Sequence, residues 1–248
     1  NHLTGNLSDS FSKLNTVFLQ LIVMIMSFAP LGVFCLIGKF VIADGLDIFQ
    51  DVVEYVVLLI SLLLFHAAFT YSFFLKAIGG LNPLTFFRKM KDVALFAFST
   101  SSSAATIPVT LRTANQDLGV NQNVASFVVP VGATINMDGT AIMQGLATVF
   151  IAQMSGIDLT LFQYIQVVLL AVATSIGTAA VPSAGTITLI IILQQFNLPL
   201  EAIGIILAVD RVLDMIRTSV NVTGDAAIAC IVAKTENQLD ENIFNSKD

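Results

Sequence analysis

Long apolar stretches alternate with short polar connectors along the chain, and their lengths predict membrane-spanning helices. A helix needs about 20 apolar residues to cross a bilayer. The stretches at residues 14–42 and 52–75 meet this requirement, and Pro30 predicts a kink in the first of them. A polar lead-in at residues 1–13 precedes them, and an acidic connector at residues 44–54 separates them.

Charged residues beside and within the second stretch predict its orientation. The connector that follows it, at residues 76–91, carries one arginine and three lysines. Basic loops stay on the cytoplasmic side of a membrane, so we expect the acidic connector on the opposite side. His66 lies inside the stretch, where we expect a single histidine to pack rather than to act as a ligand.

Two later segments are interrupted by small and polar residues and predict re-entrant helical hairpins. They lie at about 92–113 and at about 161–198, and each contains a run rich in Ser, Thr and Ala that includes a proline, Pro108 or Pro182. Ser and Thr compete with helical hydrogen bonds, and proline removes a backbone donor. A break at membrane depth is tolerated only inside protein or beside a water-filled cavity, so we expect both tips to be buried.

The span between the hairpins, at residues 124–157, is itself interrupted. Two glycines, Asn136 and Asp138 lie within residues 132–140. Unwound backbone carbonyls together with a carboxylate suit a small hard cation such as Na⁺. The alternative is a hydrogen-bonded kink that holds no ion.

The last span, at residues 200–233, carries a polar stripe in an apolar setting. At about 100° per residue its members fall on one face roughly 80° wide, and they are Asp210, Asp214, Arg217, Asn221 and Asp225. Ionisable groups inside a membrane face the bundle interior and are functional candidates by default. We expect the charged tail at residues 234–248 to be flexible.

Composition supports a helical membrane protein and excludes several other classes. The chain is 56% hydrophobic and 11% charged, whereas soluble domains carry roughly 25% charged residues. Its net charge is −6 and no basic run is present for nucleic acid. Cys35 and Cys230 lack metal-ligand spacing and are expected to pack in apolar segments.

Four motifs, in this order along the chain, resemble the dicarboxylate/amino acid:cation symporters, which include the excitatory amino acid transporters and the archaeal aspartate transporters. The motifs are residues 101–108 (SSSAATIP), 136–140 (NMDGT), 177–185 and 214–225 (DMIRTSVNVTGD). The resemblance implies an all-α integral membrane fold, a broken-helix elevator transporter with two re-entrant helical hairpins and a homotrimeric assembly.

The family pattern has eight spans, of which this chain holds the C-terminal part, spans five to eight. Residues 1–75 would then contain the lead-in and two scaffold-side or transport-domain spans. Residues 76–248 would form the transport core.

The resemblance also assigns substrate-binding roles. Arg217 would hold the side-chain carboxylate of the substrate, since its planar fork suits bidentate pairing. Asp214 would bind the amino group, with Thr218 alongside, and Asn221 would hold the α-carboxylate. The remaining residues belong to the first tip, to the middle span and to the second tip, and they are Ser101, Ser102, Ser103, Thr140, Val181, Pro182 and Gly185.

Sodium is the co-transported cation that the resemblance implies, at three sites. The first would use carbonyls of Gly132, Asn136 and Asn221 with the carboxylate of Asp225. The second would use carbonyls of Thr134, Ser175, Ile176 and Thr178. The third would use Asn136 and Asp138 with groups from spans that this chain lacks.

The chain departs from the family pattern in two respects. Family members carry an additional arginine at one of two positions, which here are Ser101 and Met215. Arg211, three residues before Asp214, is within reach to supply that charge; the alternative is that Arg211 only packs, and we expect Asp210 to be structural. Second, Gln144 replaces a glutamate linked to proton and potassium coupling in the animal members, which favours a sodium-only, prokaryotic-type member.

These features predict sodium-coupled symport of aspartate or glutamate across the plasma (inner) membrane by a multi-pass protein embedded in the lipid bilayer. A C4-dicarboxylate or neutral amino acid symporter of the same family is the nearest alternative. An intramembrane aspartyl protease using Asp138 and Asp225 is a remote one, because its partner motif is missing. A channel is disfavoured by two hairpin gates around a charged pocket. We expect a carrier and no enzyme.

Overall fold

The computed structural model describes residues 48–246 continuously and single positions between residues 13 and 42. Most of the predicted span at residues 14–42, including its kink at Pro30, therefore lies outside the described residues, as do most of the lead-in and residues 44–47 of the acidic connector. The chain divides into two compact units, at residues 1–48 and 49–248. Every element below except the first residue of the first helix belongs to the second unit.

The first long helical segment includes the whole of the predicted second span at residues 52–75. It consists of α3 (Ile48–Phe65), a π-helical turn (His66–Tyr71) and α4 (Ser72–Ala77). Within the described residues, the stretch Phe49–Ala77 is the one helix long and apolar enough to cross a membrane by length and composition. Single π-turns are frequent at functional sites, and this one places His66 and Tyr71 on the interior side.

The first hairpin is longer than predicted. Its arms are α5 (Pro83–Thr100) and α6 (Ser103–Gln116), joined by a break at Ser101 and Ser102. The predicted basic connector at residues 76–91 is thus mostly helix. The expected start of the hairpin at about residue 92 is wrong, because its first arm begins at Pro83. The physical reason is a strong start signal: the Asn82 side chain accepts a bond from the backbone N–H of Leu84, and Pro83 occupies the first turn.

The middle span and the second hairpin follow the predicted pattern closely. The middle span is α7 (Gln122–Ile135) and α8 (Asp138–Met154), with the helix interrupted at Asn136 and Met137. The second hairpin is α9 (Leu161–Ile176) and α10 (Ala184–Gln195), and its tip is the irregular segment between them.

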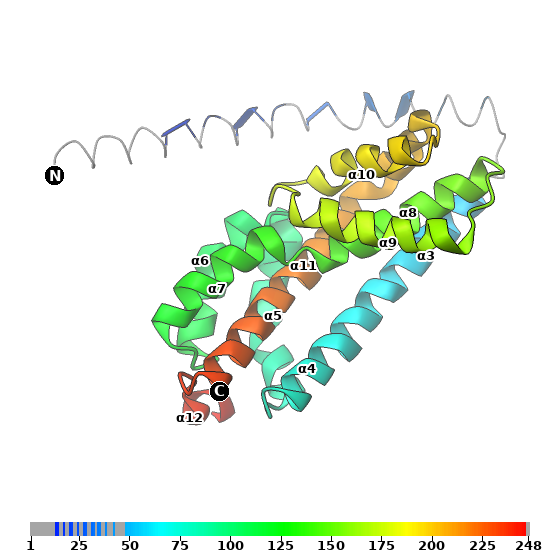
Figure 1. The fold of residues 1–248 in the computed structure, drawn as a ribbon. Coiled ribbons are helices and arrows are strands. Elements are labelled where there is room, and N and C mark those ends of the chain that lie inside the picture. Colours follow the sequence, from blue (N-terminus) through cyan, green and yellow to red (C-terminus); the bar gives the residue numbers. More distant parts are fainter. Residues whose placement is uncertain are drawn as a thin grey trace. The chain divides into compact units, whose positions relative to one another are not determined.

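The polar span is the 33-residue helix α11 (Ile203–Thr235), preceded by a short 3₁₀ turn at Leu200–Ala202. It contacts α4, α5, α6, α7, α8 and α10 (Figure 1). Both hairpins and the broken middle span therefore pack around one helix, the one that carries the polar stripe.

The tail after α11 is folded as far as residue 246, where the described residues end, so the expectation of a flexible tail is wrong for this part. It contains α12 (Glu241–Asn245), and Phe244 is fully buried. The sequence pattern missed this because a single buried aromatic side chain in a charged segment gives no periodic signal.

Candidate functional site

The polar stripe of α11 is buried in the centre of the second unit. Its five members, Asp210, Asp214, Arg217, Asn221 and Asp225, are each at most 4% exposed. Burying a charge is costly unless it is paired and hydrogen-bonded. Each of these groups must therefore find its partners within the protein, and those partners define the site.

The two hairpin tips meet beside this stripe. Each has a serine in the left-handed region, Ser101 with φ +50° and Ser183 with φ +58°. The Ser102 hydroxyl accepts a bond from the backbone N–H of Ala105 at the start of α6, and it donates to the Ala180 carbonyl at 2.9 Å. The tips are thus hydrogen-bonded to each other, and Ser103 at the N-terminus of α6 lines the same cavity as the stripe residues Asp214, Arg217 and Asn221.

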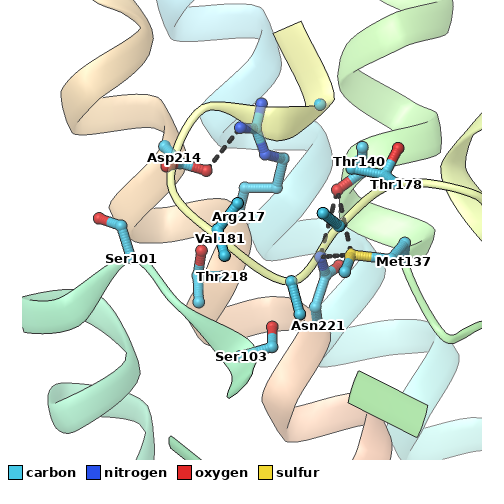
Figure 2. A pocket seen from close by; sticks show the side chains of 13 residues that line it. Ser101, Ser103, Met137, Thr140, Thr178, Val181, Asp214, Arg217, Thr218 and Asn221 are labelled. Atoms are coloured by element: carbon cyan, nitrogen blue, oxygen red, sulfur yellow. Dashed lines mark hydrogen bonds and ion pairs between the residues drawn. The ribbon is translucent and has the colours of Figure 1, made fainter. Parts of the chain in front are cut away.

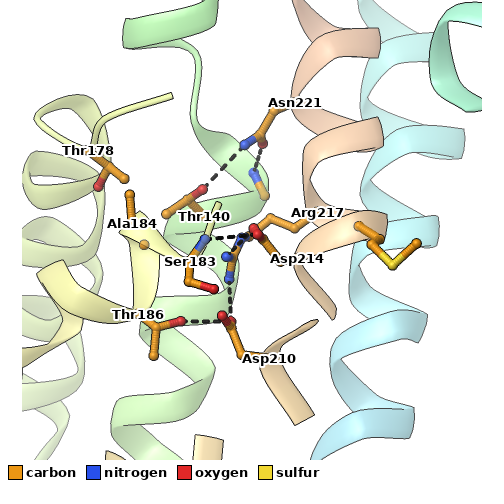
Figure 3. Close-up of polar contacts among 12 residues, drawn as sticks. Thr140, Thr178, Ser183, Ala184, Thr186, Asp210, Asp214, Arg217 and Asn221 are labelled. Carbon is orange, nitrogen blue, oxygen red and sulfur yellow. Dashed lines mark hydrogen bonds and ion pairs between the residues drawn. The ribbon is translucent and has the colours of Figure 1, made fainter. Parts of the chain in front are cut away.

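Arg217 is held between two carboxylates. Its Nη2 atom lies 2.5 Å from Asp214 Oδ1, and its Nη1 atom lies 3.5 Å from Asp210 Oδ1 (Figure 3). The second hairpin donates a hydrogen bond to each carboxylate. The Thr186 hydroxyl donates to Asp210 at 2.7 Å, and the Ser183 N–H donates to Asp214 at 2.9 Å. Asp210, which we expected to be structural, is therefore a direct neighbour of the arginine.

A small cavity of about 20 Å³ lies between the tips, α8 and α11 (Figure 2). Its lining includes all the predicted substrate residues except Ser102 and Pro182; the lining residues are Ser101, Ser103, Met137, Thr140, Thr178, Ala179, Ala180, Val181, Gly185, Asp214, Arg217, Thr218 and Asn221. Met137, Ala179 and Ala180 were not predicted, because apolar side chains beside a polar motif carry no chemical signal of their own.

Three buried polar atoms at this site have no hydrogen-bond partner among the described residues, Arg217 Nη1, Asp210 Oδ2 and the Ser101 hydroxyl. Unsatisfied buried polar atoms are rare and invite explanation by a missing ligand or water. The volume is enough for about one water molecule. A larger ligand would therefore have to open the pair between Arg217 and Asp214.

The residues predicted for the first sodium site converge at the break in the middle span. The Asn136 side-chain amide donates to Asp225 Oδ1 at 2.9 Å and to the Asn221 carbonyl at 3.3 Å. The Gly132 carbonyl accepts the N–H of Asn136 at 2.7 Å. Carbonyl and carboxylate oxygens at an unwound helix are the ligands that Na⁺ uses in transporters, so the donor set fits the ion.

Gly132 is required at this break by close approach. A Cβ atom added there would lie 2.6 Å from Asp225 Oδ1. Within the described part of the chain, no group of three His, Cys, Asp or Glu side chains could hold a metal ion. A cation at this position would therefore depend on backbone oxygens together with one carboxylate.

Asp138, predicted for the third sodium site, has partners of its own. His66 Nε2 lies 2.6 Å from Asp138 Oδ2, and the Tyr71 hydroxyl donates to the same oxygen at 2.6 Å. The Val220 carbonyl is the second acceptor near this hydroxyl, at 3.1 Å, and it shares the single Tyr71 proton with Asp138. His66 thus packs with a hydrogen bond to Asp138, in agreement with a packing histidine whose polar atom is satisfied. Tyr71 was missed because the π-turn that directs it inward has no sequence signature.

The second predicted sodium site is assembled in part. Ser175 and Ile176 end α9, and the Thr178 N–H donates to the Ser175 carbonyl at 3.0 Å. Thr134 lies exposed near the end of α7, a helix that contacts α9. The joint use of these four carbonyls stays a prediction.

Gln144 ties α8 to both arms of the second hairpin. Its amide donates to the Gly185 carbonyl at 3.0 Å and to the Thr188 hydroxyl at 2.7 Å. Its carbonyl oxygen accepts from the Thr174 hydroxyl at 2.8 Å. The side chain is fully buried and uses both ends, so the closed hairpin fits a glutamine here.

Arg211 takes no part in the site. Its side chain is exposed, and within the described residues the polar partners of Asp214 are Arg217 and the Ser183 N–H. The hypothesis that Arg211 supplies a charge to Asp214 is therefore not supported by the structure. The alternative, in which Arg211 faces outward, agrees with its exposure.

Comparison with known proteins agrees with this geometry. The model of the sodium:dicarboxylate symporter family matches residues 4–235. Excitatory amino acid transporter 2 of Homo sapiens is 42% identical over 226 residues, which are 90% of this chain and 39% of the human protein. An excitatory amino acid transporter of Caenorhabditis elegans is 41% identical over 224 residues, which are 90% of this chain and 44% of that protein. Excitatory amino acid transporter 1 of Mus musculus is 40% identical over 228 residues, which are 91% of this chain and 42% of the mouse protein. The chain thus spans about two fifths of the length of these relatives.

Proposed function

We propose, since the chain belongs to the sodium:dicarboxylate symporter family, that it forms the substrate- and sodium-binding part of a sodium-coupled symporter for an acidic amino acid. The family consists of membrane transporters, in agreement with the expectation of a carrier rather than an enzyme. The observation that carries the proposal is the buried cluster of Arg217 with Asp210 and Asp214 beside a cavity lined by both tips.

The cluster can exchange its internal ion pair for a substrate. A side-chain carboxylate of aspartate or glutamate would take the place of Asp214 on Arg217, in the bidentate geometry that a guanidinium favours. The released Asp214 carboxylate would then bind the substrate ammonium group. The α-carboxylate would lie near Asn221 and the N-terminus of α6, where the helix dipole favours negative charge.

This exchange argues against the alternatives within the family. A C4-dicarboxylate has no ammonium group, so a released Asp214 would be left as an unpaired buried charge, which costs free energy. A neutral amino acid would leave Arg217 without its second carboxylate. An acidic amino acid satisfies both groups at once.

Sodium coupling is proposed to act through a shared residue. The backbone carbonyl of Asn221 accepts a bond from Asn136 at the predicted sodium site, while its side chain lines the substrate cavity. An ion that fixes this residue fixes both sites, and a substrate that fixes it does the same. Affinities coupled in this way must rise together.

The setting of the protein is proposed on the same basis. We propose a multi-pass location in the plasma membrane and a homotrimeric assembly, as the family resemblance implies. The relatives compared are animal proteins, so the prokaryotic origin rests only on Gln144 and stays a prediction.

A ligand panel tests the proposal. The purified chain in detergent is heated with sodium chloride and with L-aspartate, L-glutamate, succinate or L-serine, and its unfolding temperature is measured. A ligand that binds only the folded state at 100 times its Kd stabilises by about 2.7 kcal/mol. We expect stabilisation by aspartate or glutamate and little by succinate or serine. Stabilisation by succinate alone would establish the dicarboxylate alternative.

A further inference from the structure

The tail after α11 is fastened to the connector between α6 and α7 by backbone pairing. We call residues 236–246 the tail clamp; they lie beyond residue 235, where the family match ends. The Asn121 N–H donates to the Gln238 carbonyl at 3.0 Å, and the Asp240 N–H donates to the Gly119 carbonyl at 2.8 Å. Val120 and Leu239 form an antiparallel bridge between these two bonds.

The contact is close enough to require glycine. Gly119 has φ +70°, and a Cβ atom there would lie 2.4 Å from the Asp240 carbonyl oxygen. Phe244, in α12, is fully buried at the end of the bundle where α6 and α7 are joined (Figure 1). The tail clamp is therefore a packed part of the unit.

Lys89 extends this contact to the first arm of the hairpin. Its ammonium group donates to the Asp117 carbonyl at 2.8 Å, to the Ile243 carbonyl at 2.7 Å and to the Ser246 hydroxyl at 3.1 Å. A lysine has three donors, so all are used. Asp117 caps the end of α6, and Ile243 lies in the last turn of α12. Both carbonyls are at helix C-termini, where a positive charge is favoured.

One side chain therefore closes the open end of the first hairpin. Lys89 lies in α5, and Asp117 lies at the end of α6, so their bond joins the two arms far from the tip. The second hairpin is tied differently: Gln144 holds its arms close to its own tip, at Gly185 and Thr188. The arms of the first hairpin are thus joined to each other at its base, and the arms of the second are joined through Gln144 near its tip.

We infer that Lys89 is a positioning residue, which acts through the tail clamp to hold the first hairpin, and with it the tip at Ser101–Ser103, as a fixed wall of the site. A hydrogen bond between the arms at the base restricts the movement of one arm relative to the other, and the bonds to the tail clamp restrict both relative to the rest of the unit. The role of the tip as a substrate wall rests on the proposed function, whereas the clamp itself rests on the contacts above.

Hydrogen exchange of the full chain in detergent micelles, followed by mass spectrometry, tests this. Lys89→Met removes the charge and keeps the length of the side chain, and Lys91→Met is the matched control because Lys91 is exposed on the same helix. Hydrogen bonds to a charged group are strong enough that we expect about ten- to a hundredfold faster exchange in residues 103–121 and 236–246. Exchange in the second hairpin, Leu161–Ile176 and Ala184–Gln195, should stay as in the unaltered chain.

Two results would overturn the inference. One is unchanged exchange of the first hairpin in Lys89→Met, and the other is an equal rise in both hairpins, which would mean general destabilisation. If Lys89→Met does not fold, Phe244→Ala replaces it in the test, because it loosens the tail clamp without altering a residue of the hairpin. Hydrogen exchange should again become faster in residues 103–121 and 236–246. These measurements need no substrate, so faster exchange in a chain that fails to bind aspartate would support the clamp and refute the proposed function.

Discussion

Replacing Arg217 should lower both the unfolding temperature of the protein and its affinity for substrate. In Arg217→Cys the carboxylates of Asp210 and Asp214 stay buried, at 2% and 4% exposure, without the cation that lies between them. Removing one partner of a buried ion pair costs about 3–5 kcal/mol. For a chain of this size each kcal/mol lowers the unfolding temperature by about 2–4 °C. We therefore expect a loss of about 6–20 °C.

The second substitution in this series separates charge from packing. Arg217→Cys combined with Asp210→Asn removes one of the two stranded charges, so the double variant should unfold at a higher temperature than Arg217→Cys alone. Residues in one ion-pair network couple by about 0.5–3 kcal/mol, which thermal unfolding in detergent can resolve. Arg211→Cys is the matched control, because the same residue type is exposed on the same helix.

The affinity of Arg217→Cys for aspartate should fall together with its stability. Truncating one partner of a buried charge pair costs about 2–5 kcal/mol in affinity, so aspartate should bind at least about thirtyfold more weakly to Arg217→Cys. Calorimetry in sodium chloride measures this. The reasoning is refuted if Arg217→Cys unfolds at the same temperature as Arg211→Cys and binds aspartate with unaltered affinity.

Three further substitutions test separate parts of the account. Asp225→Asn removes the carboxylate at the predicted sodium site, so aspartate affinity should depend less steeply on sodium; an unaltered slope in a sodium titration would exclude this residue. Gly132→Ala places a Cβ atom 2.6 Å from Asp225 Oδ1 and should raise the sodium concentration needed for half-maximal binding, whereas Gly145→Ala, where no atom lies within 4 Å, should behave like the unaltered chain. Arg211→Ala should change stability by less than about 0.5 kcal/mol, and a substantial loss of aspartate affinity in this variant would restore the role that the structure denies it.

The parts of the fold with strong backbone signals were predictable. The serine and glycine runs located both tips and the break at Asn136 and Met137, because clusters of these residues disfavour a continuous helix. Helix ends were less certain: the first arm begins at Pro83, and the basic residues after it concealed the helix. Charge alone cannot distinguish a connector from an exposed helix face.

Contacts between distant elements could not be read from the pattern. The stripe of α11 was visible, but the partners of its charges come from the second hairpin, through Thr186 and the N–H of Ser183. Three-residue spacing made Arg211 a plausible partner for Asp214, yet helix rotation turns it outward. Spacing predicts which side chains share a helix face, whereas their partners depend on packing.

The most direct test of the central claim is a sodium titration of aspartate affinity by calorimetry, with choline replacing sodium at constant ionic strength. The account places Asn221 in both sites, so the affinity for aspartate should rise steeply with sodium concentration and become undetectable in choline. The affinity for sodium should rise by the same factor when aspartate is present. Equal aspartate affinity in sodium and in choline would contradict the account.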